Sequence, residues 1–210
     1  MDFAFDVISA DQHDQLVALY EPLARAVRGL IDASIHTGVD EQTIRDAQSA
    51  IESVTQTLES TRHDGYRTLR VAESGRPVAW ANAVIGVRNP IAPPLTIHHN
   101  ADATRCWSEF SLGAPYEGPP GRVHGGVCAL VLDHLLGEVA SEGLTKPRFT
   151  GTISVKYLRA TPLGELRAEA GIERVEGVKT FVRGFIADAE GITAEAEGVF
   201  IEPAWARDAG

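Results

Sequence analysis

Apolar residues recur at helical spacing in two stretches of the first 62 residues of the chain, at positions 16–31 and 44–58. This periodicity predicts two amphipathic helices. Gly38 is expected to end the first helix and Asp40 to cap the second, because glycine is common just past a helix and aspartate at its start. Pro22 lies within the first helix and is expected to kink or break it.

From about Tyr66 the pattern changes to short runs that alternate between apolar and polar residues or are rich in β-forming residues. A long apolar segment at about 125–142 interrupts these runs and predicts a helix. Turn sequences that end in Gly164, Gly177 and Gly191 separate the later runs, which predicts an antiparallel meander. The chain is therefore expected to be an α+β protein with strands at 66–73, 77–86, 94–101, 104–112, 148–160, 165–175, 178–188 and 192–202.

The chain carries 19 basic and 29 acidic residues, a formal net charge of −10. This balance argues against binding to nucleic acid or to an anionic membrane surface. No stretch has the pattern of a signal peptide or the length of a membrane span, so we expect a cytoplasmic protein with one principal domain. Cys106 and Cys128 fit no metal or redox spacing and are expected to be reduced, buried thiols.

The stretch with the clearest chemical signal runs from Gly118 to Gly126 and is followed by six apolar residues and then Asp133. Gly125 and Gly126 would let the backbone approach a ligand closely. They lie at the expected start of the long helix, where the first backbone amides have no partner within the helix and can hold an oxyanion. Asp133 would be a carboxylate in apolar surroundings, a setting typical of a catalytic acid or base.

Gly125 and Asp133 lie eight positions apart. In a helix this spacing is about 12 Å along the axis, whereas a group that hydrogen-bonds a reacting centre must lie within about 3 Å of it. One chain therefore cannot easily apply both groups to one substrate. Two copies related by a two-fold axis can, because the amide of one would face the acid of the other. We expect a homodimer or a dimer of dimers.

These residues resemble the motif of the hotdog-fold acyl-CoA thioesterases, in which a curled antiparallel sheet wraps around a long helix. The resemblance rests on the His124–Gly126 triplet, on Asp133, and on Thr150 ahead of the 153–159 stretch. It is closest to the group that contains the phenylacetate-pathway thioesterases and human thioesterase superfamily members 4 and 5. It covers residues 66–203, which would form a hotdog domain after an N-terminal helical segment at 1–62.

The resemblance implies roles for four residues. Asp133 would act as a general base or as a nucleophile, and the Gly125 N–H would polarise the thioester carbonyl. Thr150 would place the acid or the attacking water, with Thr152 as a weaker candidate for the same role. His124 would orient the turn and the substrate carbonyl rather than transfer protons.

Simpler interpretations of the same residues stay open in the sequence. Asp133 could lie at the edge of a solvated helix face whose other members recur at helical spacing, namely His134, Glu138 and Ser141. His124 could be a structural residue that closes a turn, and Thr150 could be an ordinary strand residue.

Because the protein as a whole is acidic, positive charge for the phosphates of coenzyme A must be gathered locally. The candidates are Arg122, Lys156 and Arg159, with Gly126 as a further substrate-binding residue, although solvated strand charges explain the three cations equally well. His98-His99 would point to opposite faces of a strand, and no acid or cysteine cluster accompanies them, so no metal site is expected. Coenzyme A would enter only as part of the substrate, and no separate cofactor is expected.

The expected function is hydrolysis of acyl-CoA thioesters to free acid and CoA. An enoyl-thioester hydratase of the same fold is one alternative, but Asp133 and His134 would point about 100° apart on a helix and would not converge on a substrate. A non-catalytic acyl-CoA sensor that uses the N-terminal helices as its output is another alternative. The sequence does not determine the identity or length of the acyl chain.

Overall fold

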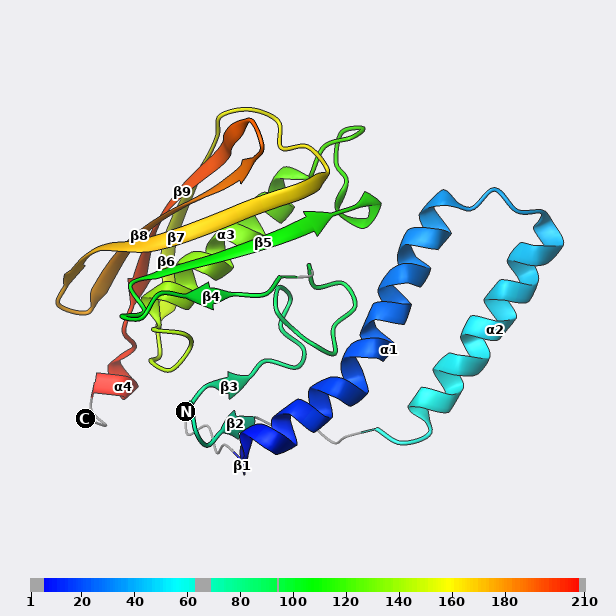
Figure 1. Ribbon diagram of the computed structural model, residues 1–210, viewed down its shortest axis with the longest axis horizontal. Helices are drawn as coiled ribbons and strands as arrows, with labels where there is room; N and C mark the ends of the chain where they lie inside the picture. The colour runs from blue at the N-terminus through cyan, green and yellow to red at the C-terminus, as the bar shows by residue number, and fades with distance from the viewer. Residues whose placement is uncertain (1–5, 63–68, 94, 208–210) are drawn as a thin grey trace.

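The computed structural model describes residues 6–62, 69–93 and 95–207. Its main layer is a six-stranded antiparallel sheet in the order β4-β5-β7-β8-β9-β6. The sheet curls around the long helix α3 (Gly125–Ala140), as Figure 1 shows. The strands are β4 (His98–His99), β5 (Arg105–Leu112), β6 (Phe149–Tyr157), β7 (Gly164–Glu176), β8 (Lys179–Asp188) and β9 (Gly191–Ile201). The predicted α+β hotdog architecture is confirmed.

The core lies between α3 and the sheet. The helix is apolar on almost all sides and buries eight of its residues. Strands β5, β8 and β9 alternate buried with more exposed residues, as strands do when only one face packs. Leu136 lies against Gly184 and Gly198, where an added Cβ atom would come to 2.9 Å from the leucine side chain. These two glycines let the helix approach the sheet closely.

A second, smaller layer contains a three-stranded sheet made of β1 (Asp6–Ile8), β2 (Leu69–Val71) and β3 (Pro77–Val78). Strands β1 and β2 pair in parallel, although they come from either side of the predicted boundary between residues 62 and 66. The division of the chain at this boundary stays a prediction. The chain ends, within the described residues, in the short helix α4 (Ala204–Arg207).

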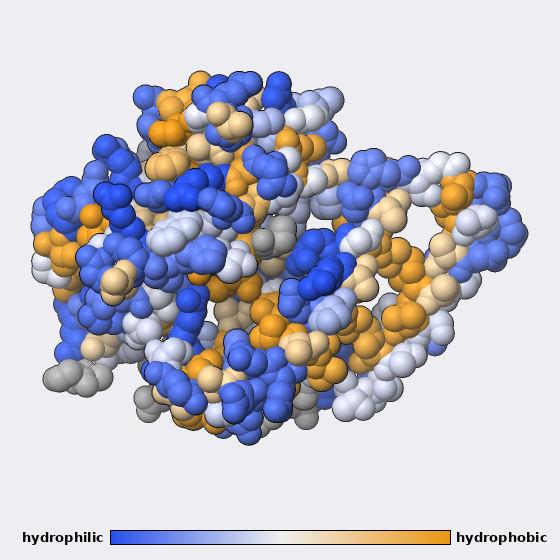
Figure 2. All heavy atoms as spheres, in the orientation of Figure 1, coloured by the Kyte–Doolittle hydropathy of each residue, from blue (hydrophilic) through white to orange (hydrophobic). Residues whose placement is uncertain are grey.

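Both predicted N-terminal helices are present. Helix α1 (Ala10–His36) continues through Pro22, so the proline does not break it. Helix α2 (Glu41–Glu59) is capped by Asp40, as predicted. Helix α1 packs on the short 3-10 helix η1 (Ala114–Tyr116), whereas α2 buries none of its residues. Hydrophobic residues gather along both helices in Figure 2.

Three expectations about the strands are wrong. Within the described part of the run 94–101, only β4 is strand. The run 77–86 contributes only two residues of strand, because the side chain of Asn82 accepts hydrogen bonds from two following backbone N–H groups and turns the chain. The meander holds for β7, β8 and β9, but β6 pairs with β9 rather than β7. The connection after β6 is instead held by the loop before α3, where Val123 N–H donates to Thr161 C=O at 2.9 Å. Residues 66–68 and 94 of two predicted runs lie outside the described residues.

Cys106 and Cys128 are free and buried, as predicted. Burial raises the pKa of the Cys106 thiol to about 12. Among the helices that the structure describes, none is both long and apolar enough to span a bilayer.

Candidate active site

The glycine- and proline-rich loop before α3 is a tight turn that bonds to itself. Gly118 N–H donates to Arg122 C=O at 2.9 Å, and Arg122 N–H donates to Pro119 C=O at 2.8 Å. Gly121 has a φ of +71°, a conformation that favours glycine. A Cβ atom at Gly118 would lie only 2.8 Å from His124 Cα. These residues therefore fix the point at which α3 begins.

His124 is the N-cap of α3, and its Nδ1 accepts a hydrogen bond from Gly126 N–H at 3.0 Å. This bond makes Nδ1 the unprotonated nitrogen, so neutral His124 carries its proton on Nε2. The Gly126 N–H is occupied by the cap. The Gly125 N–H, in contrast, donates to no group within the described part of the chain. It is therefore available to an oxyanion at the start of the helix.

Tyr157, which the sequence did not single out as a site residue, lies against this helix start. Its hydroxyl donates to Gly125 C=O at 2.7 Å, and a Cβ atom at Gly125 would lie 3.4 Å from the tyrosine. The sequence signal that could have indicated Tyr157 is its position within residues 153–159, a stretch on which the family resemblance rests. Tyr157 therefore holds the peptide between Gly125 and Gly126, the same peptide whose N–H is bonded to His124.

Asp133 is half-buried on α3, and its Oδ1 accepts a hydrogen bond from Thr150 Oγ1 at 3.0 Å. The register between β6 and β9 shifts between Thr150 and Thr152, which makes Gly151 the extra residue of a β-bulge. Ile153 packs against the core, so strict alternation would place Gly151 on the helix side of the strand. The bulge turns Thr150 to that side instead, and this distinguishes it from Thr152.

The alternative of a solvated helix face around Asp133 is contradicted. Glu138 is 0% exposed and Ser141 is 3% exposed. Ser141 Oγ donates to Gly137 C=O at 2.6 Å, so this polar side chain is satisfied within the helix. His134 Nε2 lies 3.7 Å from Glu138 Oε2 and does not join Asp133, which weakens the hydratase alternative.

A pocket of about 420 Å³ opens beside Asp133. Thr150, Gly137 and Phe200 line it, together with Pro77, Ala79 and Asn82 from the second, smaller layer. The lining residues do not include Gly125. A single copy of the chain thus keeps the acid and the available amide apart, in agreement with their spacing of about 12 Å along the helix.

Comparisons with known proteins identify the family. The sequence profile of the thioesterase superfamily matches residues 120–195. A crystal structure described as a thioesterase superfamily protein is 31% identical to this chain, has a TM-score of 0.74, and matches over 87% of this chain and 90% of that one. The chain belongs to the thioesterase superfamily. Because residues 63–210 alone cannot supply a coverage of 87%, the match extends into the N-terminal helices.

Other thioesterase superfamily structures match about half of the chain. The phenylacetic acid degradation-related protein from Ralstonia eutropha JMP134 is 22% identical, with a TM-score of 0.47 over 51% of this chain and 83% of that one. Zebrafish thioesterase superfamily member 2 is 13% identical, with a TM-score of 0.48 over 52% of this chain and 81% of that one. No curated protein matches the chain. The narrower resemblance to the phenylacetate-pathway and member 4 group stays a prediction.

The three candidate cations of this thioesterase superfamily member differ in their partners. Arg159 donates to Asp188 Oδ2 at 2.7 Å and to Gly191 C=O at 2.8 Å, so its charge is already engaged. Arg122 and Lys156 are exposed, and no ion pair joins either of them to another described residue. Their contact with CoA phosphates stays a prediction. No group of three or more His, Cys, Asp or Glu side chains in the described ranges could hold a metal ion.

Thr150→Val removes the hydroxyl that donates to Asp133 and keeps the size and branching of the side chain. Because a hydrogen bond to a charged group contributes about 1.5–3 kcal/mol, we expect kcat/KM for an acyl-CoA to fall by roughly ten- to a hundredfold. Thr152→Val is the matched control, since Thr152 is exposed on the other side of the bulge. Steady-state release of CoA measures both variants. Equal losses in the two would contradict the role of Thr150.

The Arg159 guanidinium, through its hydrogen bonds, lowers the pKa of Asp188 from 3.8 to about 2. A pKa that is lower in the folded state means that the ionised pair stabilises the fold above about pH 4 and that this contribution is lost as the pH falls toward 2. We expect Asp188→Asn to lower Tm at neutral pH, with a difference from wild type that shrinks toward pH 2. Thermal unfolding of both proteins over this range measures it. A difference in Tm that does not depend on pH would contradict the assignment.

Proposed function

We propose that this superfamily member hydrolyses acyl-CoA thioesters to free acid and CoA, at a site shared by two copies of the chain. The observation that carries the proposal is the hydrogen bond from Thr150 to Asp133, which holds a half-buried carboxylate at a pocket on α3. Membership of the superfamily supports thioester hydrolysis in general.

Asp133 performs the chemistry in this proposal. As a general base it takes a proton from water, and the water oxygen attacks the thioester carbonyl carbon. As a nucleophile its carboxylate attacks instead and forms a mixed anhydride that water then hydrolyses. On either route the C–S bond breaks and CoA leaves as a thiolate, which takes up a proton.

The start of α3 supplies electrostatic stabilisation, which complements the chemistry performed by Asp133. The Gly125 N–H and the positive end of the helix stabilise the negative charge that develops on the thioester oxygen. Tyr157, through the Gly125 C=O, and His124, through the Gly126 N–H, both hold the peptide that follows this donor, and so fix the first turn of the helix. Loss of one such donor typically lowers the rate by about a hundredfold or more.

Strand β6 supports a site shared between two copies. Among the described strands it pairs only with β9, and it lies at the edge of the sheet, where a strand is ready to pair with another chain. Thr150 near one end of β6 contacts Asp133, and Tyr157 at the other end contacts Gly125. Antiparallel pairing of β6 with its two-fold copy would bring the acid of one chain toward the available amide of the other.

The substrate's two parts are assigned to different ends of this site. The acyl group would enter the pocket beside Asp133, and the CoA phosphates would meet Arg122 and Lys156. Arg122 precedes the start of α3, and Lys156 neighbours Tyr157, so both cations lie on segments next to the Gly125 amide. No metal or separate cofactor enters the proposal.

A hydrolysis screen tests the function. Acyl-CoAs with straight chains of graded length, together with phenylacetyl-CoA, are incubated with the protein, and the free CoA thiol is detected. We expect release of CoA from at least one substrate by the wild type and none above background by Asp133→Ala. Binding of acyl-CoA without release by the wild type would favour the sensor alternative and contradict the proposal.

A further inference from the structure

One wall of the pocket beside Asp133 comes from outside the large sheet and its helix. Pro77, Ala79 and Asn82 belong to β3 and the turn that follows it, and they line the pocket together with residues of α3. Neither α1 nor α2 supplies a lining residue of this pocket. The segment 77–82 is therefore the part of the second, smaller layer that lines the pocket of the candidate acid.

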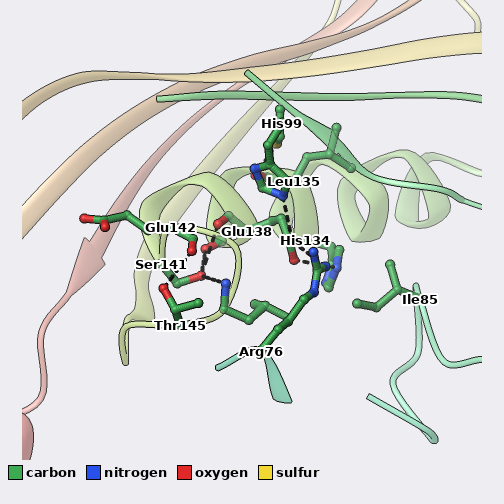
Figure 3. A network of polar contacts seen from close by, with 12 residues as sticks. Arg76, Ile85, His99, His134, Leu135, Glu138, Ser141, Glu142 and Thr145 are labelled. Carbon is green, nitrogen blue, oxygen red and sulfur yellow. Dashed lines mark hydrogen bonds and ion pairs between the residues drawn. The ribbon is translucent and has the colours of Figure 1, made fainter. Parts of the chain in front are cut away.

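Arg76, directly before this wall, reaches across to α3. Its Nη2 donates to Glu138 Oε1 at 2.6 Å, and His99 Nε2 lies 3.0 Å from the same oxygen, as Figure 3 shows. The Glu138 side chain is 0% exposed and that of Arg76 is 34% exposed. The arginine thus extends from a surface hairpin to a buried carboxylate beside the pocket.

Arg76 provides the positive charge that Glu138 requires. His134 faces the other carboxylate oxygen at 3.7 Å, but burial lowers its pKa and favours the neutral imidazole. His99 contacts the same oxygen as Arg76, but an imidazole carries a charge only when it is protonated. The Cys106 thiol is neutral because burial raises its pKa. Among the described residues, Arg76 is the one permanently charged partner of Glu138. Removal of that partner from a buried carboxylate is strongly unfavourable, so Glu138 favours the conformation in which Arg76 is docked.

The β2–β3 hairpin connects Arg76 to the wall formed by residues 77–82. Val71 N–H donates to Arg76 C=O at 3.0 Å, and Pro77 pairs with Arg70 across the turn between β2 and β3. At the far end of the wall, the Asn82 side chain closes a turn with two backbone N–H groups. The wall is therefore anchored at its first end, by the bond from Arg76 to Glu138 of α3, and ends in a local turn at Asn82.

The other cations around the pocket are already paired. Lys146 donates to Glu142 at 2.7 Å, and an Arg148 nitrogen lies 3.2 Å from a Glu202 oxygen. Asp133 would repel an acyl group that ends in a carboxylate. An uncharged acyl group, in contrast, can pack against Pro77, Ala79, Leu144 and Phe200.

We propose that Arg76 and Glu138 are positioning residues that dock the 77–82 wall beside Asp133, and that this wall selects an uncharged acyl group by its fit. Neither residue touches the reacting atoms, and both act through Pro77 and Ala79. The kinetic consequence rests on the proposed acyl-CoA hydrolysis, whereas the docking itself does not.

Hydrogen–deuterium exchange of the substrate-free protein tests the docking. We compare wild type, Arg76→Met and the matched control Arg183→Met, because Arg183 pairs with Glu197 in an exposed ion pair on neighbouring strands. We expect amides in 77–92 to exchange at least about tenfold faster in Arg76→Met and at an unchanged rate in Arg183→Met. An unchanged rate in Arg76→Met overturns the proposal. If Arg76→Met does not fold, the double variant Arg76→Met/Glu138→Gln, which leaves no buried charge, takes its place.

Steady-state kinetics test the selection of the acyl group. For Arg76→Met we expect KM for the best straight-chain acyl-CoA to rise about tenfold, kcat to stay within about threefold, and the preference among chain lengths to flatten. For Arg76→Lys, which keeps the charge, KM and the chain-length preference should lie between those of the wild type and those of Arg76→Met. A fall in kcat at unchanged KM, an unchanged chain-length profile, or a wild-type preference for a dicarboxylic acyl-CoA overturns the proposal. Failure of the wild type to release CoA from any substrate would instead contradict the proposed function, and the exchange experiment then tests the docking alone.

Discussion

Asp133→Asn is expected to lower the turnover of acyl-CoA by about a hundredfold or more while acyl-CoA still binds. The asparagine keeps the shape of the side chain, and its carbonyl oxygen can accept the hydrogen bond that Thr150 donates to the wild-type carboxylate. It lacks the negative charge that takes a proton from water or attacks the thioester. The variant therefore loses the chemical step and keeps the pocket.

Asp102→Asn is a matched control for this substitution. Asp102 also accepts a hydrogen bond from a threonine, Thr104 Oγ1 at 2.7 Å, but it does so in an exposed turn before β5. Surface substitutions of this kind change stability by about 0.5 kcal/mol or less, and we expect near-normal turnover. Release of CoA and calorimetric binding of acyl-CoA are measured for both variants. Near-normal turnover by Asp133→Asn would remove Asp133 from the mechanism.

The helix and strands of the main layer could be predicted because their buried and exposed positions follow a pattern of apolar and polar residues that are consecutive in the sequence. The apolar run after Gly126 indicates a helix that is buried on almost all sides, and the alternating runs from Gly164 onward indicate strands with one packed face. The structure places α3, β7, β8 and β9 within about two residues of these expectations.

The residue that contacts the candidate acid depends on pairing between strands. Alternation alone places Thr150 and Thr152 on the same face of β6, and the bulge at Gly151 separates them. Such a bulge is set by how β6 pairs with β9, far along the chain. For this reason the sequence could name both threonines but could not choose between them without the resemblance.

Long-range contacts also explain why the sequence left a solvated face around Glu138 open. Its helical spacing with Ser141 indicates a solvated face, yet Arg76, which lies 62 positions away in the sequence, satisfies its charge within the fold. The contact between Tyr157 and Gly125 spans 32 positions in the same way. No local pattern contains either contact.

A mixture of Gly125→Pro and Asp133→Ala chains is expected to recover activity that neither variant has alone. Gly125 is the first residue of α3, a position where proline is tolerated. His124 already has the extended backbone that the residue before a proline requires, with φ of −60° and ψ of 132°. The substitution thus removes the N–H with little change in the fold, and Gly125→Ala, which keeps the N–H, is the matched control.

The recovery follows from how the two groups are distributed. In a mixed dimer, one site combines the intact Gly125 of one chain with the intact Asp133 of the other, and the second site lacks both groups. Each parent dimer, in contrast, lacks one group in both sites. Dimers that carry a different affinity tag on each chain can be purified free of the parents.

CoA release by these purified mixed dimers tests the shared site most directly. We expect about half of the wild-type rate per dimer, because one of the two sites is complete. Both parents should remain folded and near background, and the Gly125→Ala dimer should keep most of its activity. Mixed dimers that form from folded parents and release CoA no faster than either parent would contradict the account.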